Sequence, residues 1–413
     1  MTEFIWNARR QEPGALDRAG SWRLSRLAVA VLAGWLIVDV GLRFLPVERL
    51  GVSAITAAQR FTSRHSPFRA NLSIQVPAGS PGENAVRGNL PPTELRPPLR
   101  FSTDNLGYRR NPEMPLGATP DVLFIGGDSF IYGANLSDEE TLPAAFTRAS
   151  GLLAYNGGRS HLMLMRLSDL DWLLAQLPGA PTKAVLVHLE QHRRRTKDQP
   201  GLISDLEQDL RYIRWLWNGW WDASPLSNAT RRLFRRLSND KLLTNVYEQQ
   251  VVAYELPDGR PMLFRDSETY PARIPQTPEQ IRATSEYIET WTRELRARGL
   301  QAHVLLLPTR FTLYGPWLVR GEAQPGVLRA VNDFYLLEAE LNRQGIRTIN
   351  GLEIFRQTAA QDLAARELPF YREDNHWTPE GVDRIARVLA DSLGTHPPGT
   401  GRDTSGSALG ASR

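Results

Sequence analysis

The chain of 413 residues contains no cysteine. Disulfides, thiolate metal sites and cysteine nucleophiles are therefore excluded. No group of His, Asp and Glu shows metal-ligand spacing. The net charge is only +4, and the basic clusters at 193–195 and 231–236 match no nucleic-acid-binding motif, so either cluster is a solvated basic face or a contact to an anionic polymer or lipid surface. We therefore expect no metal, no cofactor and no nucleic-acid partner.

One long apolar segment lies near the N-terminus. Residues 27–38 are apolar without interruption, and the segment extends to 47 if Asp39 and Arg43, which face each other on a helix, are tolerated. A span of about 20 residues crosses a bilayer. Five arginines precede the segment, at positions 9, 10, 18, 23 and 26. This bias predicts that residues 1–26 are cytoplasmic, that 27–47 form a single-pass bacterial inner-membrane anchor, and that the rest is periplasmic. A signal peptide and a buried helix are the alternatives.

Apolar residues make up 41% of the chain, enough for a sizeable core. Residues 48–119 are rich in Pro, Gly and Asn, which indicates a periplasmic linker and an extended lead-in to a domain over 120–394. Within the domain, amphipathic helices alternate with short apolar runs at 122–125, 152–155, 184–189, 303–307 and 346–349. This alternation predicts an α/β fold with a doubly wound parallel sheet. The tail over 395–413 is expected to be disordered.

The alternation of strands and helices lapses between residues 196 and 275, which indicates a helical insertion. Its sequence DLRYIRWLWNGWW (209–221) contains four tryptophans. These rings are suited to stacking on sugars or to lying at a membrane surface. A helical cap packed on the core is the alternative.

The stretch VLFIGGDSFIYG (122–133) reads as a buried strand that enters a tight turn at Ser129. Ligands of parallel sheets bind beyond the carboxyl ends of the strands, where this serine is expected. Gly127-Asp128-Ser129 is also ordinary turn composition. A serine becomes a nucleophile only beside a base that a third group orients.

The loop YREDNHWTPEGVDRIARVLA (371–390) offers such a base in His376, just before a helix capped by Thr378. Asp374 is two residues earlier, so in an extended loop both side chains project from the same side and can bond. The alternative is an exposed histidine in a capping loop. In a doubly wound sheet both loops open at the carboxyl edge, so His376 is expected to approach Ser129.

These segments carry a family resemblance. GGDSFIYG resembles the first block of the SGNH (GDSL-type) hydrolases, and DNHWTPEG resembles their last block in the Asp-x-His-Trp form of the periplasmic alginate O-acetyltransferases. STDNLGYR (102–109) and LLLPTRFTLYGPW (305–317) are also similar to that group. The resemblance covers about 101–394 and implies a flavodoxin-like fold. It makes Ser129 the nucleophile, His376 the general base and Asp374 its orienting partner. Glu373, at the spacing of the Asp-x-x-His form, is the alternative carboxylate.

The same resemblance implies an oxyanion hole formed by the N–H of the serine, a second-block glycine and a third-block asparagine. YNGGRS (155–160) offers Gly158, or Gly157, and HLEQHRRR (188–195) has Gln191 in place of the asparagine. Candidate substrate contacts are Arg109, Arg310, Trp377 and Tyr314.

The expected function is O-acetylation of an exported polysaccharide through an acyl-serine. The resemblance implies that a membrane-bound O-acyltransferase supplies the acetyl group. With water as acceptor the protein would be a carbohydrate or lipid esterase. A non-catalytic, polysaccharide-binding scaffold of an export complex is the alternative of another class.

Overall fold

The computed structural model describes residues 15–42, 65–88, 90–159, 167–195, 251–318 and 324–394, together with 213, 224 and 226. The chain divides into two compact units. One consists of Met1–Ala57 and Tyr212–Leu243, and the other of Ala58–Arg211 and Thr244–Arg413.

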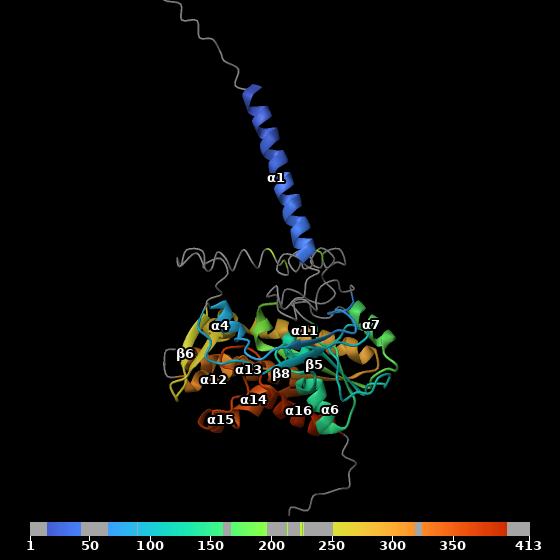
Figure 1. Ribbon diagram of the computed structural model, residues 1–413. Helices are drawn as coiled ribbons and strands as arrows, with labels where there is room; N and C mark the ends of the chain where they lie inside the picture. Colours follow the sequence, from blue (N-terminus) through green and yellow to red (C-terminus); the bar gives the residue numbers. More distant parts are fainter. Residues whose placement is uncertain are drawn as a thin grey trace, which may run out of the picture. The chain divides into compact units, whose positions relative to one another are not determined.

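The first unit contains the helix α1 (Ala15–Leu42), drawn in blue in Figure 1. Its Asp39 is buried and accepts hydrogen bonds from Ser224 Oγ at 2.5 Å and from the Leu226 N–H at 3.3 Å. In the part of the chain that the structure describes, no helix combines the length and the apolar character that a bilayer crossing requires. The expected anchor over 27–47 is therefore not confirmed, and its last five residues lie outside the described ranges.

The second unit contains a five-stranded sheet in the order β4-β3-β5-β8-β9, with all neighbouring strands parallel. Its strands are β3 (Val122–Gly126), β4 (Ala154–Asn156), β5 (Lys183–Leu189), β8 (Gln301–Leu307) and β9 (Thr348–Asn350). All five match apolar runs of the sequence, so the prediction of a parallel α/β sheet is confirmed.

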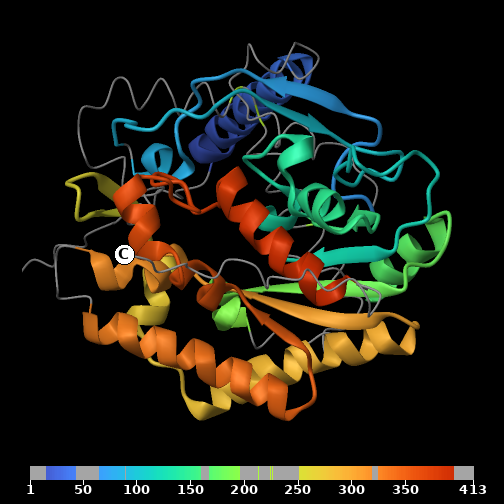
Figure 2. The same ribbon diagram turned by 90° about the horizontal axis from the view of Figure 1, so that it is seen from below.

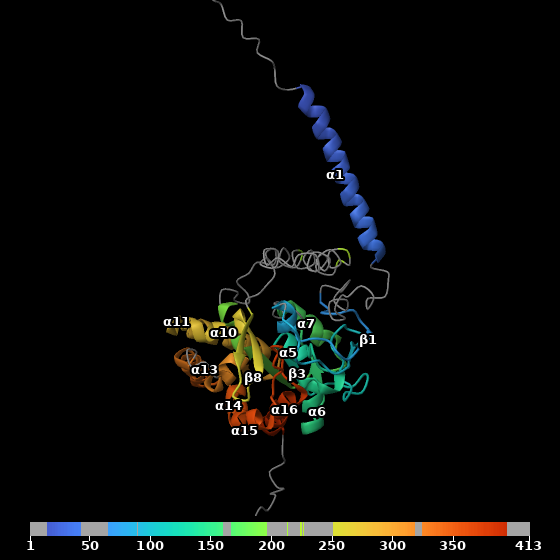
Figure 3. The same cartoon turned by 60° about the vertical axis from the view of Figure 1, so that its left-hand side comes forward.

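Helices connect these strands and cover the sheet. They are α5 (Ser129–Tyr132), α6 (Leu142–Ser150), α7 (Leu167–Gln176), α10 (Asp266–Arg273), α11 (Pro278–Ala297), α12 (Arg310–Tyr314), α13 (Gln324–Arg343), α14 (Gly351–Arg356), α15 (Ala359–Ala365) and α16 (Pro379–Leu393), with 3₁₀ turns η1 (Asp138–Glu140), η2 (Glu190–Arg195) and η4 (Gly315–Trp317). In Figure 2 the long helices α11 (gold) and α13 (orange) lie on one side of the strands and α16 (red) lies on the other. Figure 3 separates α11 and α13 from α6 in the same way.

Local sequence explains where the helices begin. Thr277 caps α11: its side chain accepts from the Gln280 N–H, and Gln280 closes the capping box. Thr378 caps α16 by accepting from the Gly381 N–H. Because Thr378 stands two residues after His376, the start of α16 fixes the end of the histidine loop.

The strand order places the serine. From β3 the chain moves to β4 on one side, and then returns past β3 to β5 on the other. The order therefore reverses at β3, and such a switch point is where parallel sheets bind ligands. Ser129 follows the carboxyl end of β3 directly.

Smaller elements surround this core. The lead-in contains β1 (Ser73–Val76), α4 (Glu83–Arg87) and β2 (Leu99–Ser102), with β1 and β2 antiparallel. The prediction of a helical insertion over 196–275 was wrong for the last part of that range. There, β6 (Val251–Glu255) and β7 (Pro261–Arg265) form an antiparallel hairpin before α10. The hairpin turn at Asp258-Gly259, with Gly259 at φ 80°, is the signal for it in the sequence. The tryptophans of 209–221 and the tail 395–413 lie outside the described residues.

Candidate active site

The turn that carries Ser129 has an unusual backbone. Gly126, Gly127 and Asp128 follow one another at φ 76°, 59° and 47°. A Cβ on Gly127 would stand 2.5 Å from Ile131 and 2.9 Å from Val187, so only glycine fits there. Asp128 is one of few non-glycine residues with positive φ among those described. Such strain persists where the surrounding structure enforces it, as at active sites.

The histidine loop contacts the serine segment directly. The rings of Phe130 and His376 lie 5.3 Å apart, and Phe130 packs edge-on against Trp377 at the same distance. Asn135, six residues after the serine, donates through Nδ2 to Asp374 Oδ1 at 2.9 Å and lies 2.9 Å from His376 Nδ1. Two segments about 240 residues apart in sequence therefore meet at the carboxyl edge of the sheet, as expected from the topology.

Asp374 is bonded to His376. The Oδ1 atom of Asp374 contacts both the backbone N–H, at 3.0 Å, and Nδ1 of the histidine. A carboxylate can only accept, so Nδ1 carries the proton and the neutral imidazole keeps its lone pair on Nε2. Nε2 is buried and has no hydrogen-bond partner among the described residues. This is the tautomer that a general base requires.

Asp374 is fully buried and ionised by its surroundings. Burial alone would raise the pKa of this carboxyl. The charge that His376 carries when it is protonated, the charge of Arg96, and the hydrogen bonds from His376 and from the Glu83 N–H, which lies 2.7 Å away, outweigh that effect and hold the pKa of Asp374 well below its usual range. The acid therefore stays negative at every pH at which the protein would work.

Glu373 points elsewhere. Its Oε1 accepts from the N–H of Thr93 at 2.6 Å and from the hydroxyl of Thr93 at 2.5 Å. The contact that orients the imidazole belongs to Asp374, so the geometry favours the Asp-x-His spacing over the alternative carboxylate.

The Ser129 side chain is half-buried, and its hydroxyl makes no hydrogen bond with any described residue. The serine and the Nε2 atom of His376 are therefore not joined in this structure, although their neighbours touch. Catalytic hydrogen bonds are often long before substrate binds. The Ser129 N–H starts α5 and makes no backbone hydrogen bond within the described ranges, so it is available to an oxyanion.

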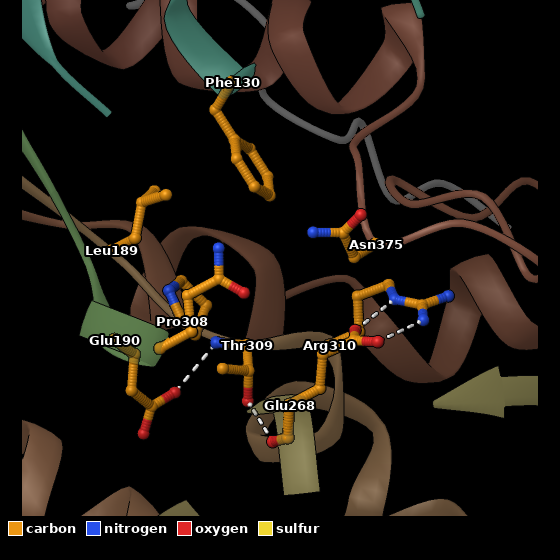
Figure 4. A pocket seen from close by; sticks show the side chains of 9 residues that line it. Phe130, Leu189, Glu190, Glu268, Pro308, Thr309, Arg310 and Asn375 are labelled. Carbon is orange, nitrogen blue, oxygen red and sulfur yellow. Dashed lines mark hydrogen bonds and ion pairs between the residues drawn. The ribbon is translucent and has the colours of Figure 1, made fainter. Parts of the chain in front are cut away.

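A small pocket lies beside this pair (Figure 4). It encloses about 240 Å³ of empty space, open mouth included. The side chains of Phe130 and Asn375 point into it from one side, and Leu189, Pro308 and Thr309 face them. Gln191, half-buried on η2, also lines the pocket, so the structure places this predicted oxyanion donor near the histidine loop. Asn375, between Asp374 and His376, was missed at the sequence level, and its buried Oδ1 finds no partner among the described residues.

The Gly158 prediction needs a correction. Gly158 does lie against the serine segment, since a Cβ on it would stand 2.5 Å from the Tyr132 nitrogen. Its N–H, however, donates to Asn156 Oδ1 at 3.0 Å, and the Gly157 N–H donates to the Phe124 carbonyl at 2.8 Å. Both amides are already used inside the protein, so neither is a free oxyanion donor here.

Arg109 and Arg310 are not substrate contacts in this structure, because both are buried and fully bonded. Arg109 pairs with Asp138 at 2.7 Å and donates to four carbonyl oxygens around the serine segment and β2. Arg310 pairs with Glu268 at 2.8 Å and donates to the carbonyls of three further residues. A buried guanidinium is tolerated only when an ion pair and hydrogen bonds offset the cost of removing its charge from water. Both arginines therefore stabilise the structure around the site.

Trp377 and Tyr314 are also core residues. Each is 0% exposed. Trp377 packs on Phe130, and Tyr314 packs edge-on against Phe370 at 6.5 Å. Neither ring can reach a substrate without rearrangement, so the prediction that they bind substrate was wrong for this conformation.

Among the described residues, the fold brings together one group with metal-ligand chemistry. Glu83, Asp374 and His376 offer ligand atoms within 4.8 Å of one another. The oxygens of Asp374 already accept from His376, Asn135, Arg96 and the Glu83 N–H. The guanidinium of Arg96 supplies positive charge at this place, so the cluster is explained as an ion-pair network.

Two comparisons with known proteins bear on this site. Residues 259–409 match the family model of the SGNH hydrolase-like domain of the acetyltransferase AlgX. That segment contains Asp374 and His376 but not Ser129. The chain is also 26% identical over 138 residues to the probable alginate O-acetylase AlgJ of Pseudomonas fluorescens, which covers 33% of this chain and 32% of that protein. The chain thus resembles the SGNH acetyltransferases in its carboxy-terminal part, as its motifs predict.

Proposed function

We propose that this protein is a serine-dependent O-acetyltransferase that acetylates an exported polysaccharide. The observation that carries the proposal is the network of Asp374, Asn135 and His376, which leaves a base nitrogen unbonded beside the serine segment. The similarity to an alginate acetylase supports the choice of acyl chemistry.

In the proposed first half-reaction, Ser129 takes the acetyl group from a donor ester. His376 Nε2 takes the proton of Ser129 Oγ as that oxygen bonds to the acetyl carbon of a donor ester. The resulting oxyanion is held by the N–H of Ser129 and by the Gln191 side chain. When the tetrahedral intermediate collapses, the donor oxygen leaves with the proton from His376, and the acetyl group stays on the serine.

The second half-reaction reverses these roles. A sugar hydroxyl gives its proton to Nε2 and attacks the acetyl carbon, and Ser129 Oγ leaves with that proton. Water at the same place would make the protein an esterase.

The cellular setting follows from the same proposal. A periplasmic domain attached to the bacterial inner membrane through the segment 27–47 would meet an exported polymer there. A membrane-bound O-acyltransferase would supply the acetyl group. The scaffold alternative keeps the fold without the chemistry, and it predicts polysaccharide binding that is independent of Ser129.

The test is acetyl release from an activated acetyl ester, with and without an oligosaccharide acceptor. Ser129→Ala should abolish both products, whereas Ser150→Ala at the end of α6 should leave them unchanged. Transfer is supported if product forms on the sugar. Release to water alone supports the esterase, and activity that survives Ser129→Ala refutes the proposal.

A further inference from the structure

Residues 84–96, in the lead-in segment ahead of the domain, contact the loop that carries Asp374 and His376. Thr93 bonds Glu373, as described above, and the Glu94 carboxylate accepts from the N–H groups of Arg372 and Glu373 at 2.9 and 3.3 Å. The Asn84 N–H donates to the Glu373 carbonyl at 2.9 Å. These contacts join parts of the chain that lie about 280 residues apart, and none of them touches the serine.

One side chain of this segment reaches Asp374. Arg96 donates through Nη2 to Asp374 Oδ2 and through Nη1 to Asn135 Oδ1. Its own backbone is fixed, because its carbonyl accepts from the Gly79 N–H at 2.9 Å and its N–H donates to the Ser80 carbonyl at 3.1 Å. The guanidinium also lies 5.8 Å from the centre of the Tyr371 ring, and it is 12% exposed.

We propose that Arg96 is a positioning residue that holds Asp374 and Asn135 in place behind His376, so that the lead-in segment is part of the working site. This inference rests on the proposed function. The planar guanidinium can reach a carboxylate and an amide at once, which the single ammonium of lysine does less well. Removing it would leave Asp374 as a buried anion with His376 as its main counter-charge.

The consequence is a defined change in the protonation of the imidazole. Without the Arg96 charge, the Asp374 carboxylate stabilises protonated His376 more strongly, and the neutral base forms only at higher pH. In the described part of the chain, Glu83 also faces the pair, and its carboxylate lies within 4.8 Å of both. Neighbouring tyrosines do not contribute, since burial holds the pKa of Tyr132 well above its usual range and raises the pKa of Tyr371 to about 12.

The experiment compares the full chain with Arg96→Ala, Arg96→Lys and Arg384→Ala. Arg384 is the matched control, because it is 16% exposed and pairs with Asp362 at 2.6 Å, without contact to Asp374. The first readout is the NMR titration of the His376 ring in histidine-labelled protein, assigned with His376→Gln. The second is the pH profile of acetyl ester cleavage.

Arg96→Ala should move the His376 titration and the acid limb of the pH profile to higher pH by roughly one unit. Arg96→Lys keeps the positive charge and should leave both close to their wild-type positions, and Arg384→Ala should shift neither. The inference is overturned if Arg96→Ala leaves the titration in place or if Arg384→Ala moves it equally. The NMR titration needs no turnover, so an inactive wild-type chain would refute the proposed function and still decide the role of Arg96.

Discussion

Replacing Asp374 by Asn removes one charge and keeps the shape of the side chain. In the native protein its two oxygens accept from His376, Asn135, Arg96 and the Glu83 N–H. An amide has one oxygen and an NH₂ group that must face donors already present. The imidazole then loses the carboxylate that keeps the proton on Nδ1. The tautomer with its lone pair on Nε2, which the general base requires, is therefore no longer enforced.

Two magnitudes follow. In serine triads the equivalent Asp→Asn exchange lowers kcat about 10⁴-fold. A loss of 10³–10⁴ corresponds to roughly 4–5.5 kcal/mol of transition-state stabilisation. The exchange also lowers the free energy of unfolding. Removing one partner of a buried ion pair costs about 3–5 kcal/mol, and Asp374 and Arg96 are 0% and 12% exposed. The thermal unfolding midpoint of the variant must therefore be measured together with its kinetics, so that lost activity is not mistaken for lost folding.

The assay is acetyl ester cleavage by Asp374→Asn next to Glu373→Gln. The control changes the neighbouring carboxylate, and its amide oxygen can still accept from Thr93. Glu373→Gln should keep activity close to the wild-type level. Our reasoning fails if folded Asp374→Asn stays within tenfold of wild type, or if Glu373→Gln loses more than it does.

Two further predictions concern residues outside the pair. Burial, with Arg347 and Lys183 nearby, lowers the pKa of His303 on β8 from 6.5 to about 4. The unfolded chain takes up this proton near pH 6.5 and the native chain only near 4, so the free energy of unfolding should fall by about 3 kcal/mol as pH drops through that window. Urea unfolding of His303→Gln should lack this part of the pH dependence; an unchanged slope would contradict it. Gln191→Ala should lower kcat by about 10²–10³ without changing the unfolding midpoint, and an unaltered kcat would remove Gln191 from the oxyanion site.

The sheet could be predicted because its strands are short apolar runs between turn residues. The serine and histidine positions followed from topology, since parallel strands place their following loops at one edge. The cap of α16 was predicted from Thr378 in the local sequence. These features depend on local sequence or on a rule that holds for every doubly wound sheet.

The contacts behind the histidine could not be predicted in the same way. Arg96 lies in an extended, proline-rich stretch without periodicity, and its partner Asp374 is 278 residues away. No local pattern indicates such a pairing. For Arg109 and Arg310, charge suggested an exposed contact, but each pairs with a buried carboxylate that only the fold brings near. The hairpin at 251–265 was missed because its first strand, β6, has no buried residue and shows no two-residue alternation.

The central claim is that the His376 base activates Ser129. A fluorophosphonate that modifies only activated serines tests it directly, with the labelled peptide identified by mass spectrometry. We predict that the label appears on Ser129 of the wild-type chain and is lost in His376→Gln and in Ser129→Ala. Label on another residue, or equal labelling of Ser129 in His376→Gln, would contradict this mechanism.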